Sequence, residues 1–335
     1  MAGTVLVTGG AGYIGSHVVL GLLEAEHPVI VLDDLSKGRR DAVPAAASFV
    51  EGDVGDPTLL SQVLRDHAVS TVMHFAGATV VPESVAEPLK YYLQNTSKSR
   101  SLIQACVDAA VGSFVFSSTA AVYGDVDGAA VTEATPPRPA SPYGTSKLMT
   151  EWMLRDAALA HGLKVAVLRY FNVAGADPQG RSGQSTPGAT HLIKIACEAA
   201  CGRRPGMEIF GTDYGTPDGT CIRDYIHVTD LAEAHLACLR ALEDPAKAQE
   251  SQLLFNCGYG QGFSVRQVLE AVERVSGRPL SVREVARRPG DVAEVVADSA
   301  AIRSRLDWRP QYDDLDLIVK TALAWEEKLA AEDQA

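Results

Sequence analysis

The feature that most constrains the fold of this chain is an alternation, through its first half, of short apolar runs with longer helical patterns. The runs are rich in β-branched and aromatic residues and are apolar at nearly every position, which is typical of parallel strands buried on both faces. Strands that alternate with helices predict a parallel sheet with helices on both sides. The expected strands are Thr4–Thr8, Val29–Asp33, Phe49–Glu51, Thr71–Phe75, Ser113–Ser117 and Val165–Arg169, and the helical patterns include Leu59–His67, Ala86–Ala110 and Tyr143–His161.

The pattern changes after Tyr170. A loop rich in Gly, Pro, Ser and Gln is expected over Ala176–Gly188. Helices are then expected near Thr190–Ala200, Val228–Leu242, Ser264–Ser276 and Asp314–Leu329, with short strands near Glu208–Phe210, Leu253–Asn256 and Leu280–Glu284. We therefore predict an α/β protein in which residues 1–175 form a doubly wound parallel sheet and residues 176–335 mainly form a smaller α/β domain. Residues 227–262 are expected to return to the first domain.

Composition excludes several classes of protein. The chain has 335 residues, and its 30 basic and 42 acidic side chains give a formal charge of −12, which argues against a nucleic-acid binder. No apolar run approaches the roughly 20 residues that span a bilayer. The first residues lack the basic stretch and cleavage site of a signal peptide, so a cytoplasmic location is expected. The 6 cysteines form no C-x-x-C pair and no metal set, and we expect free thiols and no metal.

A glycine-rich turn follows the first expected strand. Gly9, Gly12 and Gly15 stand between that strand and a helical pattern, in G-x-x-G-x-x-G spacing. Such glycines allow a tight turn and a close approach of the backbone to a pyrophosphate, which the helix N-terminus then attracts. The strand before and the helix after this motif indicate a Rossmann-type dinucleotide site rather than a turn without a ligand.

Asp33 ends the second expected strand, 18 residues after Gly15. A carboxylate at this place can accept a hydrogen bond from the adenine ribose and repels a 2′-phosphate, so it favours NAD over NADP. The nearby Arg39 and Arg40 leave the alternative open, because an arginine can accommodate that phosphate.

The segment from Ser141 to Lys147 contains Tyr143-x-x-x-Lys147. Residues four apart share a helix face, so this spacing places an ammonium near the phenol. Free tyrosine has a pKa of about 10, and nearby positive charge favours the phenolate, which makes Tyr143 a candidate general base and acid. Ser117-Ser118-Thr119 follows the fifth expected strand, where a hydroxyl can reach a bound substrate. No G-x-S-x-G motif indicates a hydrolase.

Taken together, these motifs resemble the extended short-chain dehydrogenase/reductase superfamily, and within it the UDP-glucose 4-epimerase (UDP-galactose 4-epimerase) family. The segments VTGGAGYIGSH, VLDDLS, EGD, HFAG, FVFSSTAAVYGD, SPYGTSK, LRYFNVAGADP, FGTDYGTPDGTCIRDYIHVTDLA and RRPGD carry the resemblance from Val7 to Asp291. It implies an NAD-dependent isomerase that interconverts UDP-galactose and UDP-glucose through a 4-keto sugar. It also implies a homodimer, packed through helices such as Ala86–Ala110.

The resemblance implies roles for individual residues. Tyr143 would be the catalytic base and acid, with Lys147 beside it and Thr119 hydrogen-bonded to the sugar hydroxyl. The NAD contacts, besides the three glycines and Lys147, would come from Tyr13, Ile14, Asp33, Asp53, Val54, Phe75, Ala76, Gly77 and Phe171. The UDP-sugar would be held by Thr119, Tyr143, Asn172, His191, Leu192, Phe210, Arg223, Tyr225, Arg288, Asp291 and Val295. Arginines suit a diphosphate, with which guanidinium pairs bidentately.

Some positions depart from the family pattern. Thr79 replaces a lysine that reaches the cofactor phosphates in many relatives, and the run from Gln94 to Ser99 leaves an asparagine contact to NAD open. His191 replaces a common asparagine beside the uridine. In the resembled family a bulky aromatic residue at the position of Val295 excludes N-acetylated sugars, so valine implies weaker conversion of UDP-N-acetylgalactosamine beside UDP-galactose and UDP-glucose, unless it is a buried strand residue without substrate contact. An N-acetylhexosamine or pentose UDP-sugar is the alternative substrate.

Two other functions on the same fold were weighed. Related dehydratases and decarboxylases carry a glutamate in the run after the fifth strand, whereas this chain has Thr119-Ala120-Ala121, which favours epimerisation. A non-enzymatic NAD sensor would need the glycines but not Tyr143, Lys147 or the arginines.

Overall fold

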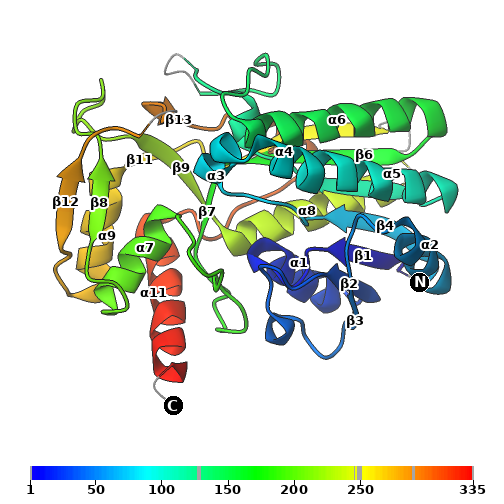
Figure 1. Cartoon of the computed structure of the whole chain (residues 1–335), viewed down its shortest axis with the longest axis horizontal. Helices are drawn as coiled ribbons and strands as arrows, with labels where there is room; N and C mark the ends of the chain where they lie inside the picture. Colours follow the sequence, from blue (N-terminus) through cyan, green and yellow to red (C-terminus); the bar gives the residue numbers. More distant parts are fainter. Residues whose placement is uncertain (1, 127–129, 245, 247–250, 289–290, 334–335) are drawn as a thin grey trace.

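The computed structural model describes residues 2–126, 130–244, 246, 251–288 and 291–333. Its main feature is a sheet of 7 strands in the order β10-β6-β5-β4-β1-β2-β3, and every neighbouring pair is parallel (Figure 1). The predicted doubly wound parallel sheet is confirmed. Its strands are β1 (Thr4–Thr8), β2 (Val29–Asp33), β3 (Ser48–Glu51), β4 (Val69–His74), β5 (Ser113–Ser117), β6 (Lys164–Tyr170) and β10 (Gln252–Cys257).

Helices cover both faces of this sheet. On one face, α1 (Tyr13–Glu24) packs against α8 (Val228–Glu243); on the other lie α2 (Pro57–Asp66), α5 (Lys98–Asp108) and α6 (Pro142–His161) (Figure 1). In β1, Val5 and Val7 belong to the apolar core between the sheet and α1 and α8, and Leu6 belongs to the core on the opposite face; all three are fully buried. Burial on both faces is the physical reason for the uninterrupted apolar runs.

The strand order reverses between β1 and β4, so a crevice opens at the carboxyl ends of these two strands, where ligands bind in open α/β sheets. The Gly9–Gly15 turn follows β1 there, and Phe75–Gly77 follows β4. The phenylalanine N–H donates to the Thr8 carbonyl across a distance of 2.9 Å, which ties the two turns together.

The expectation of one helical segment over Ala86–Ala110 is wrong in detail. The chain forms α3 (Val81–Ala86), α4 (Pro88–Tyr91), a π-helical segment over Tyr92–Ser97 and then α5. Pro88 causes the first break, because a proline disfavours the helical conformation of the residue before it, and Glu87 has φ −127° and ψ 62°. The π-helical segment turns Asn95 into the interior, where it is buried.

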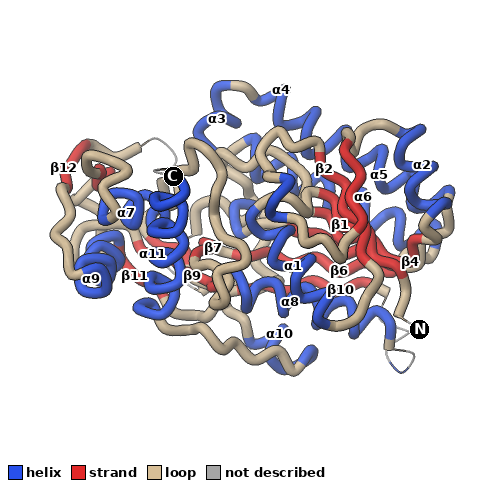
Figure 2. Tube along the Cα trace, turned by 90° about the horizontal axis from the view of Figure 1, so that it is seen from below, coloured by secondary structure: helices blue, strands red, loops and turns tan. Residues whose placement is uncertain are grey.

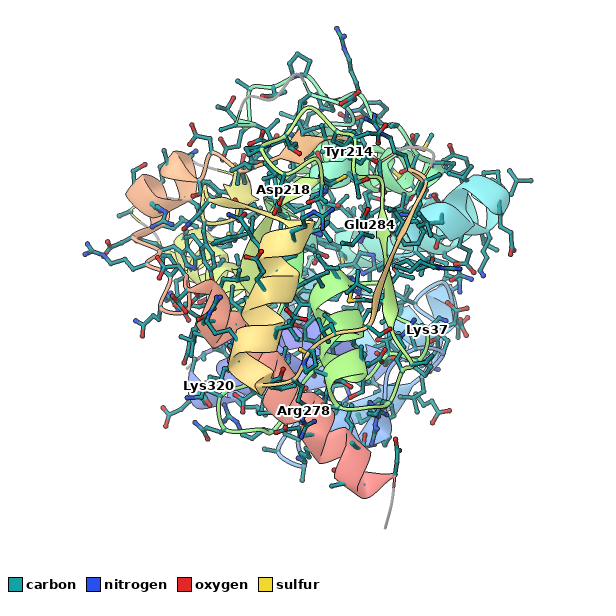
Figure 3. All side chains as sticks on the ribbon, turned by 90° about the vertical axis from the view of Figure 1, so that its left-hand side faces the viewer. Lys37, Tyr214, Asp218, Arg278, Glu284 and Lys320 are labelled. Atoms are coloured by element: carbon teal, nitrogen blue, oxygen red, sulfur yellow. The ribbon has the colours of Figure 1, made fainter. Side chains whose placement is uncertain are left out.

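Most of the remaining helices and strands form a smaller unit beside the large sheet (Figure 2). β9 (Ile222–His227) pairs with β7 (Asn172–Ala174), β11 (Gly262–Ser264) and β13 (Glu294–Val295), and β8 (Met207–Phe210) pairs with β12 (Val282–Val285). The helices α7 (Leu192–Ala200), α9 (Val265–Ser276) and α11 (Leu315–Glu332) pack on one another, as Figure 3 shows, with Arg278 near their end. α10 (Ala300–Leu306) contacts β10 and α8.

β9 was not among the predicted strands, because polar residues interrupt its sequence. One of them, Asp224, is fully buried and accepts hydrogen bonds from the backbone N–H groups of Tyr259, Gly260 and Ala297. Because this carboxylate hydrogen-bonds three backbone N–H groups, it can be buried, but in the sequence an aspartate is typical of a residue exposed to solvent. None of the helices in the described parts of the chain is long and apolar enough to cross a membrane.

Candidate active site

The Gly9–Gly15 turn forms a backbone cradle at the crevice. Gly9 has φ +71°, and a Cβ there would lie 2.5 Å from the Ala76 nitrogen; a Cβ on Gly15 would lie 2.2 Å from the Gly9 carbonyl oxygen. Only glycine permits both contacts. No side chain caps the N-terminus of α1, which follows Gly12, so its first N–H groups are free of side-chain partners. An uncapped helix start at a close-packed glycine turn fits the pyrophosphate of a dinucleotide.

Asp33 lies beside this cradle at the end of β2. One of its carboxylate oxygens accepts a hydrogen bond from the Ala11 N–H at 3.0 Å and the other from the Leu35 N–H at 2.9 Å. Burial raises the pKa of this carboxyl, and the two backbone donors oppose that rise. Each oxygen retains a lone pair, which a ribose hydroxyl can use.

The two arginines that left NADP open are both engaged elsewhere. The Arg39 guanidinium donates to the exposed carboxylate of Asp41 at 2.9 Å through Nε. The Arg40 guanidinium lies over the Phe49 ring, 4.5 Å from its centre. These contacts agree with the preference for NAD that Asp33 indicates.

The far side of the crevice is formed by the turn after β4 and by the π-helical segment. Asn95 accepts a hydrogen bond from the Ala78 N–H at 2.7 Å and donates to the Ala78 carbonyl at 3.0 Å and to Ser146 at 3.0 Å. Gly77 has φ +154°, and a Cβ on it would lie 2.7 Å from the Asn95 oxygen and 3.9 Å from the Lys147 nitrogen. The asparagine therefore supports the turn from behind, and the lysine ammonium lies close to Gly77.

Other expected cofactor residues line this region in different ways. Phe75 packs on His235, with their ring centres 4.8 Å apart. Asp53 is half-exposed and pairs with Lys98 at 2.7 Å. Val54 and Phe171 are buried, whereas Thr79 is exposed. The Tyr13 hydroxyl donates to the Gly175 carbonyl at 2.6 Å, and Ile14 packs on the core beneath α1.

Helix α6 carries the expected catalytic pair. Ser141 caps this helix by accepting from the Gly144 N–H at 3.3 Å, and Pro142 occupies its first position, so Tyr143 enters in the first turn. The Tyr143 side chain is buried, and the hydroxyl of Thr119, the residue before the short helix Ala120–Val122 after β5, lies close enough to lower the pKa of its phenol. The Thr119 oxygen also accepts from the Ala121 N–H at 3.1 Å, and its own proton is available to the phenol.

Burial acts on the charges of the Tyr143 and Lys147 pair. Burial raises the pKa of the Tyr143 phenol, and the hydrogen bond from Thr119 opposes that rise, so groups of the protein alone do not produce a phenolate at neutral pH. Burial also lowers the pKa of Lys147 to about 8, against the nearby negative charge of Glu151. The Lys147 ammonium donates to the Ser117 carbonyl at 3.0 Å and lies over the Phe116 ring, 4.9 Å from its centre.

Several of the residues expected to hold a diphosphate lie together on the smaller unit. The Arg223 guanidinium donates to the backbone carbonyls of Ile222 and Val292, each at 2.8 Å. The Arg288 guanidinium lies over the Phe210 ring, 4.4 Å from its centre, and pairs with Asp291 at 3.0 Å. Pro289 and Gly290, which complete this motif, are outside the described residues.

The remaining expected substrate residues lie on or next to four elements, β7, β9, α7 and β13. Asn172 on β7 pairs in register with the buried Tyr225 on β9. His191 precedes α7, whose first residue is Leu192, and its ring nitrogen lies 3.4 Å from the amide nitrogen of Gln184. Val295 on β13 is buried in a small apolar cluster that includes Phe171.

Sequence reasoning missed a buried polar network behind the catalytic helix. Glu151, one turn after Lys147, pairs with Arg169 of β6 at 2.5 Å and accepts a short hydrogen bond from the Ser118 hydroxyl. Arg169 also donates to the Tyr123 hydroxyl at 3.0 Å. The signal was present, because Glu151 continues the four-residue spacing of Tyr143 and Lys147.

The cysteine thiols are unpaired with one another, as the sequence predicts. All 6 cysteines are free, and burial raises the pKa of the Cys106, Cys197 and Cys238 thiols. Among the described residues, no group of three or more His, Cys, Asp or Glu side chains is arranged to hold a metal ion.

Comparison with known proteins agrees with this geometry. A profile described as "NAD dependent epimerase/dehydratase family" matches residues 5–258, and the chain belongs to that family. Within it, the expected resemblance to UDP-glucose 4-epimerases is confirmed. The chain is 58% identical to the UDP-glucose 4-epimerase of Azospirillum brasilense over 325 residues, which are 97% of this chain and 92% of the relative.

A second relative and a solved structure give the same result. The UDP-glucose 4-epimerase of Lacticaseibacillus casei is 44% identical over 324 residues, or 97% of each chain. The crystal structure of UDP-glucose 4-epimerase from Brucella ovis in complex with NAD superposes with a TM-score of 0.93 at 42% identity, covering 97% of this chain and 99% of that one.

Proposed function

We propose that this protein is an NAD-dependent isomerase that interconverts UDP-galactose and UDP-glucose by inverting the fourth carbon of the sugar through a 4-keto intermediate. The observation that carries the proposal is the buried Tyr143 with the Thr119 hydroxyl near its phenol and Lys147 one turn away, its ammonium close to Gly77 in the crevice that the glycine cradle borders. The names of the relatives support it.

NAD would lie along the crevice between the turns after β1 and β4. The first N–H groups of α1 would meet its pyrophosphate, and Asp33 would accept from its adenine ribose. Lys147, which lies beside Gly77, would hold the nicotinamide ribose. Bound NAD supplies the hydride acceptor that oxidises the sugar and, as NADH, the donor that reduces it again. The similar UDP-glucose 4-epimerase structure from Brucella ovis is a complex with NAD, which supports NAD as the cofactor.

Tyr143 would remove the proton of the sugar 4-hydroxyl and later return it. Thr119 would donate its hydroxyl proton to the phenolate or the sugar oxygen, and the Ala121 N–H, which its oxygen accepts, holds the hydroxyl in place. The ammonium of Lys147 would stabilise the phenolate that burial alone disfavours. These three side chains come from the end of β5 and the first turns of α6, so the large sheet fixes their geometry.

The smaller unit would bind UDP and leave the sugar free to turn. Arg223 and Arg288 are the cations of this region, and a diphosphate pairs with guanidinium. Arg223 is held by two backbone carbonyls and Arg288 by the Phe210 ring, so both are preorganised. Epimerisation requires such a division, because the keto sugar must present both of its faces to the same hydride position.

The run after β5 argues against dehydration or decarboxylation. Ala120 and Ala121 follow Thr119 in the short helix, where the related enzymes of those classes need a carboxylate. The nearby carboxylate of Glu151 is buried in its pair with Arg169 and is not available to a substrate. Elimination and decarboxylation therefore lack their acid or base here.

The decisive experiment is to incubate the purified protein with UDP-galactose, without added NAD, and to separate the products by chromatography. We expect UDP-glucose, with NAD retained from expression and released on denaturation. A 4-keto-6-deoxy product would indicate a dehydratase, and absence of any conversion, even with added NAD, would refute the proposed function. Parallel incubations with UDP-N-acetylgalactosamine and a UDP-pentose measure the breadth of the sugar site.

We further propose that the protein is a cytoplasmic homodimer. Its free thiols suit a reducing compartment. Large apolar side chains are exposed on packed neighbours: Leu89 on α4 is 79% exposed and Trp152 on α6 is 47% exposed. Light scattering should report a dimer for the wild type and a monomer for Leu89→Glu. Val282→Glu, an exposed apolar site on β12, is the control and should remain dimeric; a monomeric wild type would refute the proposal.

A further inference from the structure

Glu151 continues the catalytic stripe of α6 into the interior. Tyr143, Lys147 and Glu151 follow one another at intervals of four residues, so they lie on one face of the helix. All three are buried. The carboxylate is joined to the Arg169 guanidinium by bonds of 3.0, 3.2 and 2.5 Å, so both charged groups are fully engaged.

The pair is fastened to the loop that carries Thr119. The Ser118 hydroxyl donates to Glu151, and the Ser118 N–H donates to the Leu168 carbonyl of β6 at 2.8 Å. On the other side of the loop, the Lys147 ammonium holds the Ser117 carbonyl at 3.0 Å. Two residues of α6, Lys147 and Glu151, therefore hydrogen-bond neighbouring residues of the segment Ser117–Thr119.

The network also extends to the smaller unit. Arg169 donates to the Tyr123 hydroxyl, which donates to Asn256 at 2.6 Å. The Asn256 amide donates in turn to the Val131 carbonyl at 2.7 Å, and Val131 forms a bridge with Ala297. None of the residues in this series of hydrogen bonds, from Arg169 to Val131, takes part in the proposed reaction itself.

We propose that Glu151 is a positioning residue for the epimerisation: paired with Arg169, it anchors the Ser117–Thr119 segment and keeps Lys147 charged beside Tyr143. This inference rests on the proposed function. It assigns a role to a carboxylate that touches neither the sugar nor the cofactor.

The electrostatic part follows from what surrounds Lys147. Burial in the apolar interior disfavours its ammonium, and Glu151 is the negative group that opposes this effect. His74 on β4 also faces it, but burial lowers the pKa of that imidazole to about 3, so it is neutral at working pH. Burial raises the pKa of the Tyr143 phenol, and the Arg169 guanidinium contacts the Glu151 carboxylate without being among the groups that shift the pKa of Lys147. Loss of the carboxylate should therefore lower the pKa of Lys147 further.

The test uses the double variant Glu151→Gln/Arg169→Met in the full chain with its retained cofactor. It removes both buried charges together, so neither is left unpaired. We expect the alkaline limb of the kcat/KM profile for UDP-galactose to move down by about one pH unit, and kcat at pH 8.5 to fall about eightfold. Nuclear magnetic resonance of ¹³Cε-labelled lysine, with Lys147→Arg for assignment, should show the same shift without turnover.

The control is another buried ion cluster, in which Lys194 pairs with Glu326 and Glu198 and in which Arg203 also pairs with Glu326; its double variant is Glu326→Gln/Lys194→Met. It should leave the pKa of Lys147 and the alkaline limb unchanged. Glu151→Asp retains the charge and should restore the wild-type limb. If the Glu151/Arg169 variant keeps both the wild-type profile and the wild-type lysine titration, the proposal is overturned.

Should that double variant fail to fold, Ser118→Ala tests the anchoring directly. We expect kcat to fall about tenfold while KM, NAD content and melting temperature are kept, and a wild-type kcat would overturn the proposal. Absence of UDP-galactose conversion by the wild type would instead refute the proposed function, and the lysine titration would still report on Glu151.

Discussion

Replacing Tyr143 by phenylalanine should separate catalysis from binding. The change removes one hydroxyl from a buried ring that packs edge-on against Tyr91, with ring centres 6.4 Å apart, so the ring itself stays in place. Loss of a general acid–base group typically costs 10²–10⁴ in rate. We expect a loss of that order in kcat, with UDP affinity by calorimetry within about threefold of wild type.

Thr119→Ala supplies the scale for this comparison. It removes one hydrogen bond to the phenol, and hydrogen bonds to charged groups are worth about 1.5–3 kcal/mol. At 1.36 kcal/mol for each tenfold change in rate, this predicts a loss of about 10- to 150-fold. The effect should therefore be smaller than that of Tyr143→Phe.

Both variants are assayed by chromatographic quantification of UDP-glucose formed from UDP-galactose. Tyr312→Phe is the matched control, because its ring stacks on His227, 4.5 Å away, outside the proposed site, and its turnover should be wild type. Turnover of Tyr143→Phe above a tenth of wild type, or a larger loss in Thr119→Ala than in Tyr143→Phe, would refute the assignment of the phenol as the proton acceptor.

Three further predictions test the cradle, the interior and the sugar site. Gly15→Ala places a Cβ 2.2 Å from a backbone oxygen, so NAD released on denaturation should fall severalfold below wild type, whereas Gly215→Ala, with nothing within 4 Å, should retain it. Burial lowers the pKa of His17 and His235 from about 6.5 to about 4, so both imidazoles stay neutral in the folded protein at pH 5. The unfolded chain binds their protons below pH 6.5, so the free energy of unfolding decreases as the pH is lowered from 6.5. Each should cost about 2 kcal/mol at pH 5, and urea unfolding of His235→Gln should lose less between pH 7.5 and pH 5 than wild type; an equal loss would contradict this. Val295→Tyr should lower kcat/KM for UDP-N-acetylgalactosamine more than for UDP-galactose, whereas an equal loss in both would identify Val295 as a packing residue only, since overpacking costs about 1–3 kcal/mol.

Much of the cofactor region could be predicted from the chain alone, because its requirements are local. Gly9, Gly12 and Gly15 are needed wherever a strand turns directly into a helix around a phosphate, and Asp33 follows from the length of one strand–helix–strand unit. The pair Tyr143 and Lys147 needs only the helical repeat. The parallel sheet could also be predicted from the sequence, because strands that are buried on both faces are apolar at nearly every position.

Other features arise from residues that are distant in sequence. The partner of Glu151 is 18 residues away on another element, and Thr119 meets Tyr143 only because β5 ends against the first turn of α6. The strand character of residues 222–227 was hidden by Asp224, whose three backbone partners come from segments that are 35 or more residues further along. The burial of the phenol is a further such feature: the spacing shows the nearby ammonium, whereas the surrounding elements determine how far burial raises the pKa. The hydrophobic pattern of the sequence indicates which side chains are buried. Which buried charges pair, and how much free energy their burial costs, depends on how helices and strands pack together, and no local sequence pattern contains that information.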